Sequence, residues 1–473
     1  MHDLKGATMY PGFVDSHIHL VGYGELLSKA VASHCTTVEQ FKDVIKKEAT
    51  KLSGKEWLFV DLWDENQLDR LPTLSELDAL YGGPMVLRRV CRHVCLTNHT
   101  GLAAIGITAS NSVEDEQVGH DETGQLNGLL YENKNDLLVN EATKNVTDEQ
   151  LVQYVENAIQ HLTASGITGV HSEDLGYFGQ YTKSLQAYKK VIGEEKPFRA
   201  HLLRNHRVFQ QMMEDGASVD GKYIEFGAMK LFADGSFGGN TAWLKEAYVG
   251  TQTTGIALHT DEQFAQWLQL ARKYDSGIAV HAIGDAAVDQ FIRHLERVPP
   301  VAMRDRYIHG SLCSTEQMKA LKKLHVIVDA QPAFLLSDMP WLQEKLGKRE
   351  ARLYPWKTFL NEGLVLGAGT DAPIESISPF ETIWAGVTRK KPSSQVVFDA
   401  SERLTRYEMV HMYTVGSAYT GNQELYRGKI QKDFDADFTI VDTDLLCCEE
   451  AAILKANVLQ TVIDGKVVYD SSL

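Results

Sequence analysis

Long apolar runs are absent from the sequence: no stretch approaches the roughly 20 consecutive apolar residues that a membrane-spanning helix needs. Cysteine is scarce, with six residues in 473 and no paired CxxC spacing, which argues against a disulfide framework and a structural zinc ribbon. Basic side chains are the minority, and the formal net charge of −16 disfavours the phosphate attraction on which nucleic-acid binding usually depends. We therefore expect no membrane insertion, no nucleic-acid partner and free thiols.

A secretory signal is not recognisable either, because the first residues, Met-His-Asp-Leu-Lys-Gly-Ala-Thr, contain no basic stretch followed by an apolar one. The expected location is cytoplasmic, and the expected partner is a small neutral or cationic substrate. The composition is that of a globular protein, with 44% hydrophobic and 23% charged residues. A chain of 473 residues predicts one large domain of roughly 250 to 350 residues with smaller units attached.

The strand pattern predicts the fold class. From about residue 151 onward, short β-branched apolar runs alternate with helical patterns, which is typical of βαβ units and a parallel sheet. Eight strands joined by crossover helices predict an α/β protein built on a closed (β/α)8 TIM-type barrel. The predicted strands are Gly12–Ile18, Gly166–His171, Phe198–Leu203, Ile224–Phe232, Gly277–Ala282, Tyr307–Gly310, Val326–Ala330 and Leu364–Gly369.

Smaller units are predicted around the barrel. The stretch between the first two strands is too long for a barrel loop, so residues 51–140 are predicted to form an inserted α+β subdomain. The barrel then takes residues 11–50 and 141–420, residues 1–10 are the stub of a β-sandwich, and residues 421–473 form a β unit. Within that unit we expect strands at Gly428–Asp442 and Val458–Tyr469, with Asp464-Gly465 as a hairpin turn.

Two histidines on the first predicted strand form the first candidate for a metal site. Successive side chains of a strand alternate between its faces, so His17 and His19 point the same way and can bind one ion. The spacing is common, however, and two histidines on a half-exposed strand would give the same pattern.

Three further polar residues stand at strand ends of the same barrel. His281 ends the fifth predicted strand, His309 ends the sixth, and Asp371 follows the eighth. Each has an ordinary explanation: a core histidine for the first two, and a turn before Pro373 for the third. Because barrel enzymes place their chemistry at the carboxyl ends of the strands, all five side chains are expected at one site, which favours a metal centre.

Lys230 is the unusual member of this set, because an unpaired ammonium at the end of an apolar strand is costly. A salt bridge, for example with Asp234, is one explanation. The other is that CO₂ has converted the amine into a carbamate, an anion whose two oxygens can bridge two metal ions.

Together these segments resemble the amidohydrolase superfamily, and most closely the branch called amidohydrolase family 3, over nearly the whole chain. The motifs that carry the resemblance are Pro-Gly-Phe-Val-Asp-Ser-His-Ile-His-Leu, Met-Lys-Leu-Phe-Ala-Asp-Gly-Ser, Val-His-Ala-Ile-Gly-Asp-Ala-Ala, Gly-Thr-Asp-Ala-Pro and Ala-Asp-Phe-Thr-Ile-Val-Asp.

The resemblance implies a two-metal site, with two zinc ions bridged by carboxylated Lys230. One ion would be held by His17, His19 and Asp371, and the second by His281 and His309. In the insertion, the resemblance also places substrate-binding candidates within and around Arg89–Asn98, although ordinary fold-stabilising contacts would explain them equally well. These candidates are Trp63, His93, Asn98 and Glu132.

Two departures from the family pattern bear on the fold. Members usually carry several strands before the first barrel strand, whereas this sequence reaches its barrel almost directly, so the β-sandwich is expected to be small and incomplete. Its edges could be covered by a partner subunit, which makes a homodimer the expected assembly. Ile308 stands where the family often has an acidic residue.

The implied activity is hydrolysis of a non-peptide C–N bond in a small molecule. A metal ion lowers the pKa of bound water and polarises a carbonyl, so metal-bound hydroxide would attack the substrate while Asp371 serves as general base and then general acid. Two alternatives remain open: a mononuclear deaminase of the same superfamily, for which Asp285 could supply the acidic residue after the fifth strand, and a non-catalytic scaffold on the same fold.

Overall fold

The structure is a computed structural model that describes residues 4–112, 115–339, 341–349 and 351–472. The chain divides into two compact units: the barrel unit comprises Met1–Gly24, Asp148–Gly176 and Gln180–Leu473, and the second unit comprises Glu25–Thr147 and Tyr177–Gly179. The second unit encloses the stretch 51–140, and the domain boundaries given above stay predictions. No helix among the described residues is long and apolar enough to cross a membrane.

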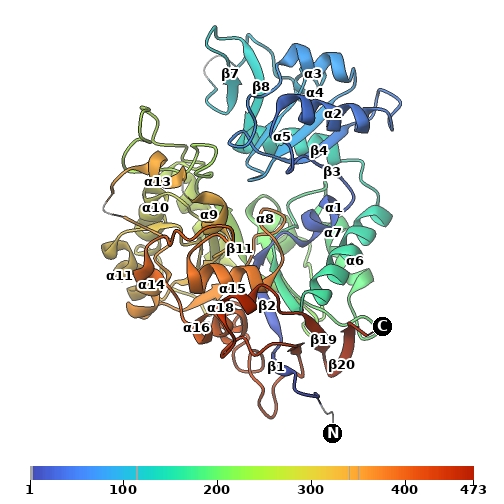
Figure 1. The fold of residues 1–473 in the computed structure, drawn as a ribbon. Helices are drawn as coiled ribbons and strands as arrows, with labels where there is room; N and C mark the ends of the chain where they lie inside the picture. The colour runs from blue at the N-terminus through green and yellow to red at the C-terminus, as the bar shows by residue number, and fades with distance from the viewer. Residues whose placement is uncertain (1–3, 113–114, 340, 350, 473) are drawn as a thin grey trace. The chain divides into compact units, whose positions relative to one another are not determined.

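The predicted eight-stranded parallel sheet is present and nearly closes into a barrel (Figure 1). Its strands follow the order β17-β15-β13-β12-β11-β10-β9-β2. Each strand lies where the sequence predicts one, with ends that differ by a residue or two at most. The strands are β2 (Phe13–Ile18), β9 (Ile167–Ser172), β10 (Arg199–Asn205), β11 (Ile224–Phe232), β12 (Ile278–His281), β13 (Arg306–His309), β15 (Ile327–Ala330) and β17 (Leu366–Ala368).

Helices connect these strands and lie around them in Figure 1. Helix α9 (Asp261–Lys273) shows why such segments are helical: a capping box of Thr260 and Gln263 begins it, and Phe264, Leu268 and Ala271 are buried at helical spacing. The other crossover helices are α6 (Asp148–Ala164), α7 (Tyr181–Val191), α8 (His206–Glu214), α10 (Asp285–Leu295), α11 (Thr315–Lys323) and α14 (Trp356–Asn361), followed later by α15 (Pro379–Thr388), α16 (Arg406–His411) and α17 (Ser417–Thr420).

The first and last strands of the barrel are joined by the carboxylate of Asp15. This buried side chain accepts hydrogen bonds from the backbone N–H of His17 and from both the N–H and the hydroxyl of Thr370. Gly369 lets the two strands approach, because a Cβ there would lie 2.6 Å from the backbone nitrogen of His17. The N–H of Asp371 then donates to the carbonyl of His17 at 2.7 Å. Residues 17 and 371 are thereby held side by side.

A four-stranded antiparallel sheet forms where the two ends of the chain meet, in the order β1-β18-β19-β20 (Figure 1). It consists of β1 (Thr8–Pro11), β18 (Phe438–Val441), β19 (Val458–Ile463) and β20 (Lys466–Asp470). The predicted hairpin turn is confirmed, with positive φ at both Asp464 and Gly465. Among the described residues this unit is a single sheet, as expected for an incomplete sandwich.

One predicted strand is wrong over most of its length. The structure has a strand only at Phe438–Val441, whereas residues 428–437 form turns and bends. The acidic residues that look like the outer face of a strand are instead partners of arginines: Asp435 accepts from Arg427, and Asp437 accepts from Arg199. These ion pairs override the alternating pattern.

The second unit contains a six-stranded mixed sheet in the order β3-β4-β5-β6-β8-β7. Side chains alternate along β5, so Met85 and Leu87 belong to one hydrophobic core and Val86 to another. Its elements are β3 (Ala30–Val31), β4 (Leu58–Trp63), β5 (Met85–Arg89), β6 (Val94–Leu96), β7 (Val118–His120), β8 (Leu126–Tyr131), α2 (Val38–Ala49), α3 (Leu74–Leu80), α4 (His99–Ala104) and α5 (Glu132–Thr143).

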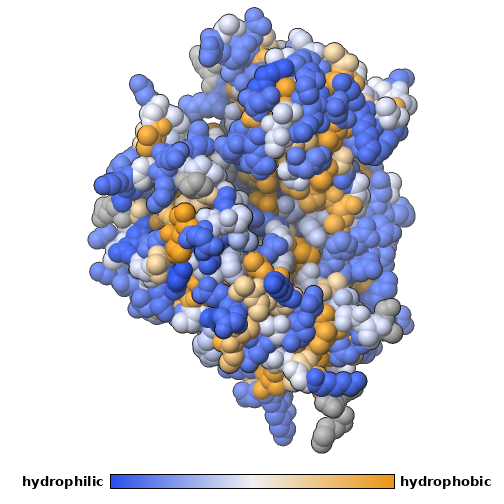
Figure 2. Space-filling model, viewed as in Figure 1, coloured by the Kyte–Doolittle hydropathy of each residue, from blue (hydrophilic) through white to orange (hydrophobic). Residues whose placement is uncertain are grey.

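Apolar residues are concentrated in these cores, and the face drawn in Figure 2 is mostly hydrophilic with scattered hydrophobic patches. All six cysteines are free thiols, as predicted.

The ion pair between Arg199 and Asp437 is expected to stabilise the barrel unit strongly. It is buried and bidentate, with N–O distances of 2.9 and 3.0 Å. Replacing Arg199 by Met leaves a buried carboxylate without its partner, which costs about 3 kcal/mol. We expect a midpoint of thermal unfolding several degrees lower, with partial recovery in the double variant Arg199→Met/Asp437→Asn.

The matched control is Lys196→Met, which removes an exposed lysine 2.9 Å from Glu156. Exposed pairs contribute roughly 0 to 1 kcal/mol, so its midpoint should stay near that of the unaltered protein. Equal midpoints for Arg199→Met and Lys196→Met would contradict this role of the buried pair.

Candidate metal centre

The six residues predicted to hold metal lie at one end of the barrel. His17 lies in β2 and His19 directly follows it, Lys230 lies near the end of β11, and the others end β12 and β13 or follow β17. Since parallel strands end at the same rim, these positions bring the side chains together. The candidate set is His17, His19, Lys230, His281, His309 and Asp371.

Measured distances show how closely the set converges. Ligand atoms of His17, His309 and Asp371 lie within 4.8 Å of one another. Oδ1 of Asp371 lies 3.5 Å from Nε2 of His17 and 3.3 Å from Nε2 of His19. Nζ of Lys230 lies 3.3 Å from Nε2 of His17. His281 joins the group through His309, because Nδ1 of the first lies 2.9 Å from Nε2 of the second.

Hydrogen bonds define which nitrogens of His309 and His281 carry protons. The amide nitrogen of Gln331 donates to the carbonyl of Asp329, so its oxygen faces Nδ1 of His309 at 2.9 Å and requires an N–H there. Nε2 of His281 faces the carbonyl of Gly235 at 3.0 Å and must also be protonated. The neutral rings therefore direct two lone pairs at each other across 2.9 Å, a repulsive arrangement that a shared cation relieves.

His19 is oriented in the same way. Its Nδ1 donates to the backbone carbonyl of Glu173 at 2.7 Å, which leaves Nε2 to face the carboxylate of Asp371. Oδ1 of Asp371 is buried and has no hydrogen-bond partner in the described residues, and the same is true of Nδ1 of His17. Nitrogen and carboxylate ligands with their second nitrogen held by an acceptor are typical of zinc sites. The residues present therefore fit a divalent metal.

The charges at the site influence one another. Burial lowers the pKa of Lys230 to about 8, and burial together with the charge of Lys230 lowers the pKa of His17 well below its usual value. Burial opposes charge on His19 and Asp371 as well, yet their mutual contact raises the pKa of His19 and lowers that of Asp371. A positive charge is thus stabilised between His19 and Asp371, at the place where a metal ion would lie.

Two of the candidate ligands have a strained backbone. His309 has a φ of 85° and Asp371 a φ of 57°, both in the left-handed region that favours glycine. Such conformations persist where the surrounding structure imposes them, and they are frequent at functional sites. Here each one directs a side chain from the end of a strand toward the centre of the barrel.

One part of the barrel interior is an apolar cluster. Ile308, the position at which the sequence departs from the family pattern, packs with Leu203, Ala228 and Ala279 in this buried cluster. Another part is polar, because buried Arg306 donates to the carboxylate of Asp329 and to the carbonyl of Ser16.

Sequence reasoning missed two residues that orient these side chains. Glu173 is fully buried directly after β9, where Asn205 donates to its Oε1 at 2.9 Å. Gln331 directly follows β15. The signal in the sequence is position alone: Gln331 directly follows a predicted strand, and Glu173, like Asp371, stands two residues after one.

The substrate-binding candidates of the insertion lie in the second unit. The indole N–H of Trp63 donates to the carbonyl of Leu87, and Asn98 caps α4 through the N–H of Gly101. His93 and Glu132 pair at 2.7 Å. All four thus have partners within their own unit, and their contact with a substrate stays a prediction.

The alternative partners considered for Lys230 and for a deaminase have other contacts. The carboxylate of Asp234 accepts from the backbone N–H groups of Trp243, Ile283 and Gly284. That of Asp285 accepts from the backbone N–H of Lys245 at the start of α10. Asp234 also lies 3.6 Å from Nε2 of the candidate ligand His281, whereas Asp285 connects the loop of Lys245 to α10.

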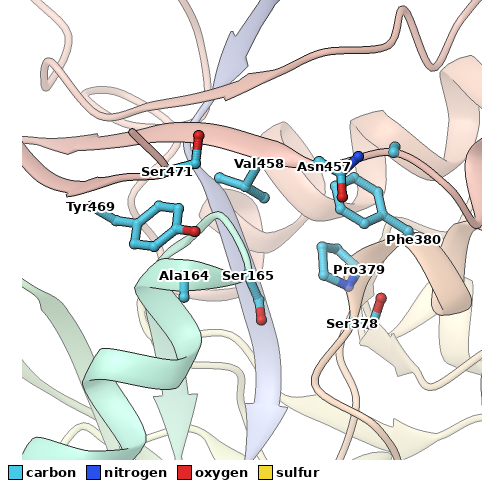
Figure 3. Close-up of a pocket in the computed structure, with 10 residues that line it drawn as sticks. Ala164, Ser165, Ser378, Pro379, Phe380, Asn457, Val458, Tyr469 and Ser471 are labelled. Carbon is cyan, nitrogen blue, oxygen red and sulfur yellow. The ribbon is translucent and has the colours of Figure 1, made fainter. Parts of the chain in front are cut away.

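The cavity drawn in Figure 3 lies elsewhere in the barrel unit. Its volume is about 410 Å³. Ala164 and Ser165 line it before the amino end of β9, whereas the candidate ligands stand at the carboxyl ends of the strands. The other lining residues come from α15, its preceding residue and the terminal sheet: Ser378, Pro379, Phe380, Ala456, Asn457, Val458, Tyr469 and Ser471. The cavity is therefore distinct from the candidate metal centre.

Gln331 is expected to control metal affinity through His309. Replacing Gln331 by Ala removes the acceptor for Nδ1, and loss of such a partner typically weakens metal binding by about 10- to 100-fold. Competition with a chelator should show this loss, whereas Gln331→Glu, which keeps an acceptor, should retain most of the affinity. Equal retention of metal by Gln331→Ala and the unaltered protein would show that His309 needs no such support.

Comparison with known proteins identifies the family. A model of the amidohydrolase family matches residues 1–469. The chain is 37% identical to the putative amidohydrolase YtcJ of Bacillus subtilis (strain 168), over 99% of this chain and 90% of that protein. It is 23% identical to the N-substituted formamide deformylase of Arthrobacter pascens, over 99% and 89%. The crystal structure of an uncharacterized metal-dependent hydrolase from Pyrococcus horikoshii OT3 matches with a TM-score of 0.75 at 28% identity, over 95% of this chain and 89% of that one. The chain therefore belongs to the amidohydrolase family of metal-dependent hydrolases.

Proposed function

We propose that this protein hydrolyses a non-peptide C–N bond, of the amide type, in a small molecule. The observation that carries the proposal is the convergence of imidazole and carboxylate lone pairs at one rim of the barrel, with 2.9 Å between His281 and His309 and 3.3 Å between His19 and Asp371. The names of two relatives, a putative amidohydrolase and a formamide deformylase, support C–N bonds as the target.

We assign the ligands to two zinc ions. His17, His19 and Asp371 would hold the first ion, and His281 and His309 the second. Lys230, which is fully buried with its Nζ 3.3 Å from His17, would bridge them as a carbamate. In that reaction the neutral amine attacks the carbon of CO₂, an N–C bond forms as one C=O π bond opens to give an oxygen anion, and one amine proton passes to water. The anion formed replaces a cation that would repel metal ions.

Asp371 is the proposed general base and acid. Metal ions at this site would supply a water of lowered pKa and a Lewis acid for the substrate carbonyl. Oδ1 of Asp371, which is buried and lies 3.3 Å from Nε2 of His19, is placed to accept a proton from the attacking water. The same oxygen can then pass that proton to the departing amine. The contact with His19 keeps Asp371 ionised at the start of this cycle.

Replacing Asp371 by Asn tests this role. The amide can still coordinate metal through its oxygen but cannot shuttle a proton, so we expect bound zinc and a decrease in kcat of about 100-fold or more. The matched control is Asp285→Asn, an identical chemical change at the residue that a deaminase mechanism would need. Full activity in Asp371→Asn would refute the assignment, and loss of activity in Asp285→Asn alone would support the deaminase.

Metal content tests the bridge. Protein supplied with zinc and bicarbonate should contain about two ions per chain, and Lys230→Ala should contain about one or fewer. Isotopically labelled bicarbonate should give a carbamate signal by nuclear magnetic resonance in the unaltered protein and none in the variant. Two ions in Lys230→Ala would show that no carbamate is needed.

A further inference from the structure

Two phenylalanine rings lie next to the His281 and His309 pair, one beside each imidazole. Phe232 is the last residue of β11 and lies two positions after Lys230, so both side chains point into the barrel. Its ring centroid lies 5.4 Å from that of His281 and 4.2 Å from Nζ of Lys230. Phe334 begins α12 (Phe334–Asp338), and its ring centroid lies 5.9 Å from that of His309.

Both rings are partly exposed, unlike the imidazoles that they contact, which are buried. Each ring therefore contacts a candidate ligand and keeps some apolar surface accessible to solvent. Their positions are also fixed: Phe232 belongs to a strand, and the N–H of Phe334 donates to the carbonyl of Gln331, the residue whose side chain orients His309. The segment from Gln331 to Phe334 thus fixes both the imidazole of His309 and the phenyl ring beside it.

The opposite side of the candidate site is polar. His19, Asp371 and the buried carboxylate of Glu173 lie there, with Oε2 of Glu173 3.7 Å from Nδ1 of His19. A substrate carbonyl held between the two sides would meet carboxylates on one side and phenyl rings on the other. An apolar substituent gains free energy when it leaves water for the phenyl surface, whereas a charged substituent there loses its hydration.

We propose that Phe232 and Phe334 determine specificity by receiving an apolar substituent, aromatic or branched aliphatic, next to the scissile bond. The inference rests on the proposed function and narrows its substrate class to amides with such a substituent. The net charge of the whole chain, −16, does not determine this preference, because the surface that receives the substituent consists of two uncharged rings.

Hydroxamates provide a probe that needs no turnover, because the hydroxamate group chelates zinc and carries a variable substituent. We expect the zinc-loaded protein to bind benzohydroxamate about 10-fold or more tightly than acetohydroxamate, as judged by calorimetry, since pocket contacts of this size give preferences of that order. In Phe232→Ala and in Phe334→Ala the ratio of the two affinities should fall toward one. Phe232→Leu and Phe334→Leu, which keep an apolar side chain, should retain part of it.

Phe398→Ala is the matched control, because this ring is also partly exposed in the barrel unit but contacts Arg389 and none of the candidate ligands. Its affinity ratio should equal that of the unaltered protein. Zinc content is measured in every variant, so that a lost metal is not mistaken for a lost preference. A ratio near one in the unaltered protein, or an unchanged ratio in both alanine variants, overturns the inference.

A parallel panel of N-acyl amides separates the two proposals. Hydrolysis of charged and apolar amides at equal kcat/KM would leave the proposed function standing and overturn the inference. A benzohydroxamate preference without hydrolysis of any amide would overturn the proposed function and support the apolar recognition surface. If neither hydroxamate binds the zinc-loaded protein, the metal site fails, and the inference fails with it.

Discussion

The carboxylate of Asp15 is the interaction on which the candidate site depends. It lies on the first barrel strand and accepts three hydrogen bonds, two of them from Thr370 beyond the last strand. A buried carboxylate left without such donors would be costly, so the two strands stabilise each other only in this register. Because the side-chain period of a strand is two residues, a slip by one position would turn His17 and Asp371 away from each other. The same hydrogen bonds thus fix both the contact between the first and last barrel strands and the geometry of the candidate site.

The hydrogen bonds that orient the candidate ligands extend this constraint to other strands. Gln331 fixes one nitrogen of His309, Gly235 fixes one of His281 and Glu173 fixes one of His19. Each of these partners accepts a hydrogen bond, so each directs a lone pair toward the centre. The pattern is costly for an unliganded protein with neutral imidazoles, because acceptors then face acceptors at hydrogen-bond distance. A scaffold without catalytic function would gain nothing from such an arrangement, which favours an enzyme over that alternative.

The strands are predictable from the sequence because buried strands consist of continuous apolar runs. The candidate ligands stand out because they are polar residues at the ends of those runs. Lys230 and His281 are conspicuous for that reason. Glu173 and Gln331 were missed because they look like ordinary loop residues until the hydrogen bonds to His19 and His309 are seen. The same limit explains the wrong strand at residues 428–437, where Asp435 and Asp437 alternate like exposed strand residues. Asp435 pairs with the nearby Arg427, but Asp437 pairs with Arg199, which lies more than two hundred residues away in the sequence. A local sequence pattern cannot reveal such a contact.

Metal binding and folding are coupled at this site for a simple electrostatic reason. Without metal, the contact between His19 and Asp371 is favourable only when a proton lies between them, and the raised pKa of His19 reflects this need. A divalent ion held by these candidate ligands would replace that proton and remove the repulsion between His281 and His309, so it would bind the folded arrangement far better than an unfolded chain. Any ligand that binds only the folded state stabilises it. The acceptors that orient the candidate ligands would therefore weaken the barrel without metal, whereas the hydrogen bonds between Asp15 and Thr370 hold the first and last strands together in either state.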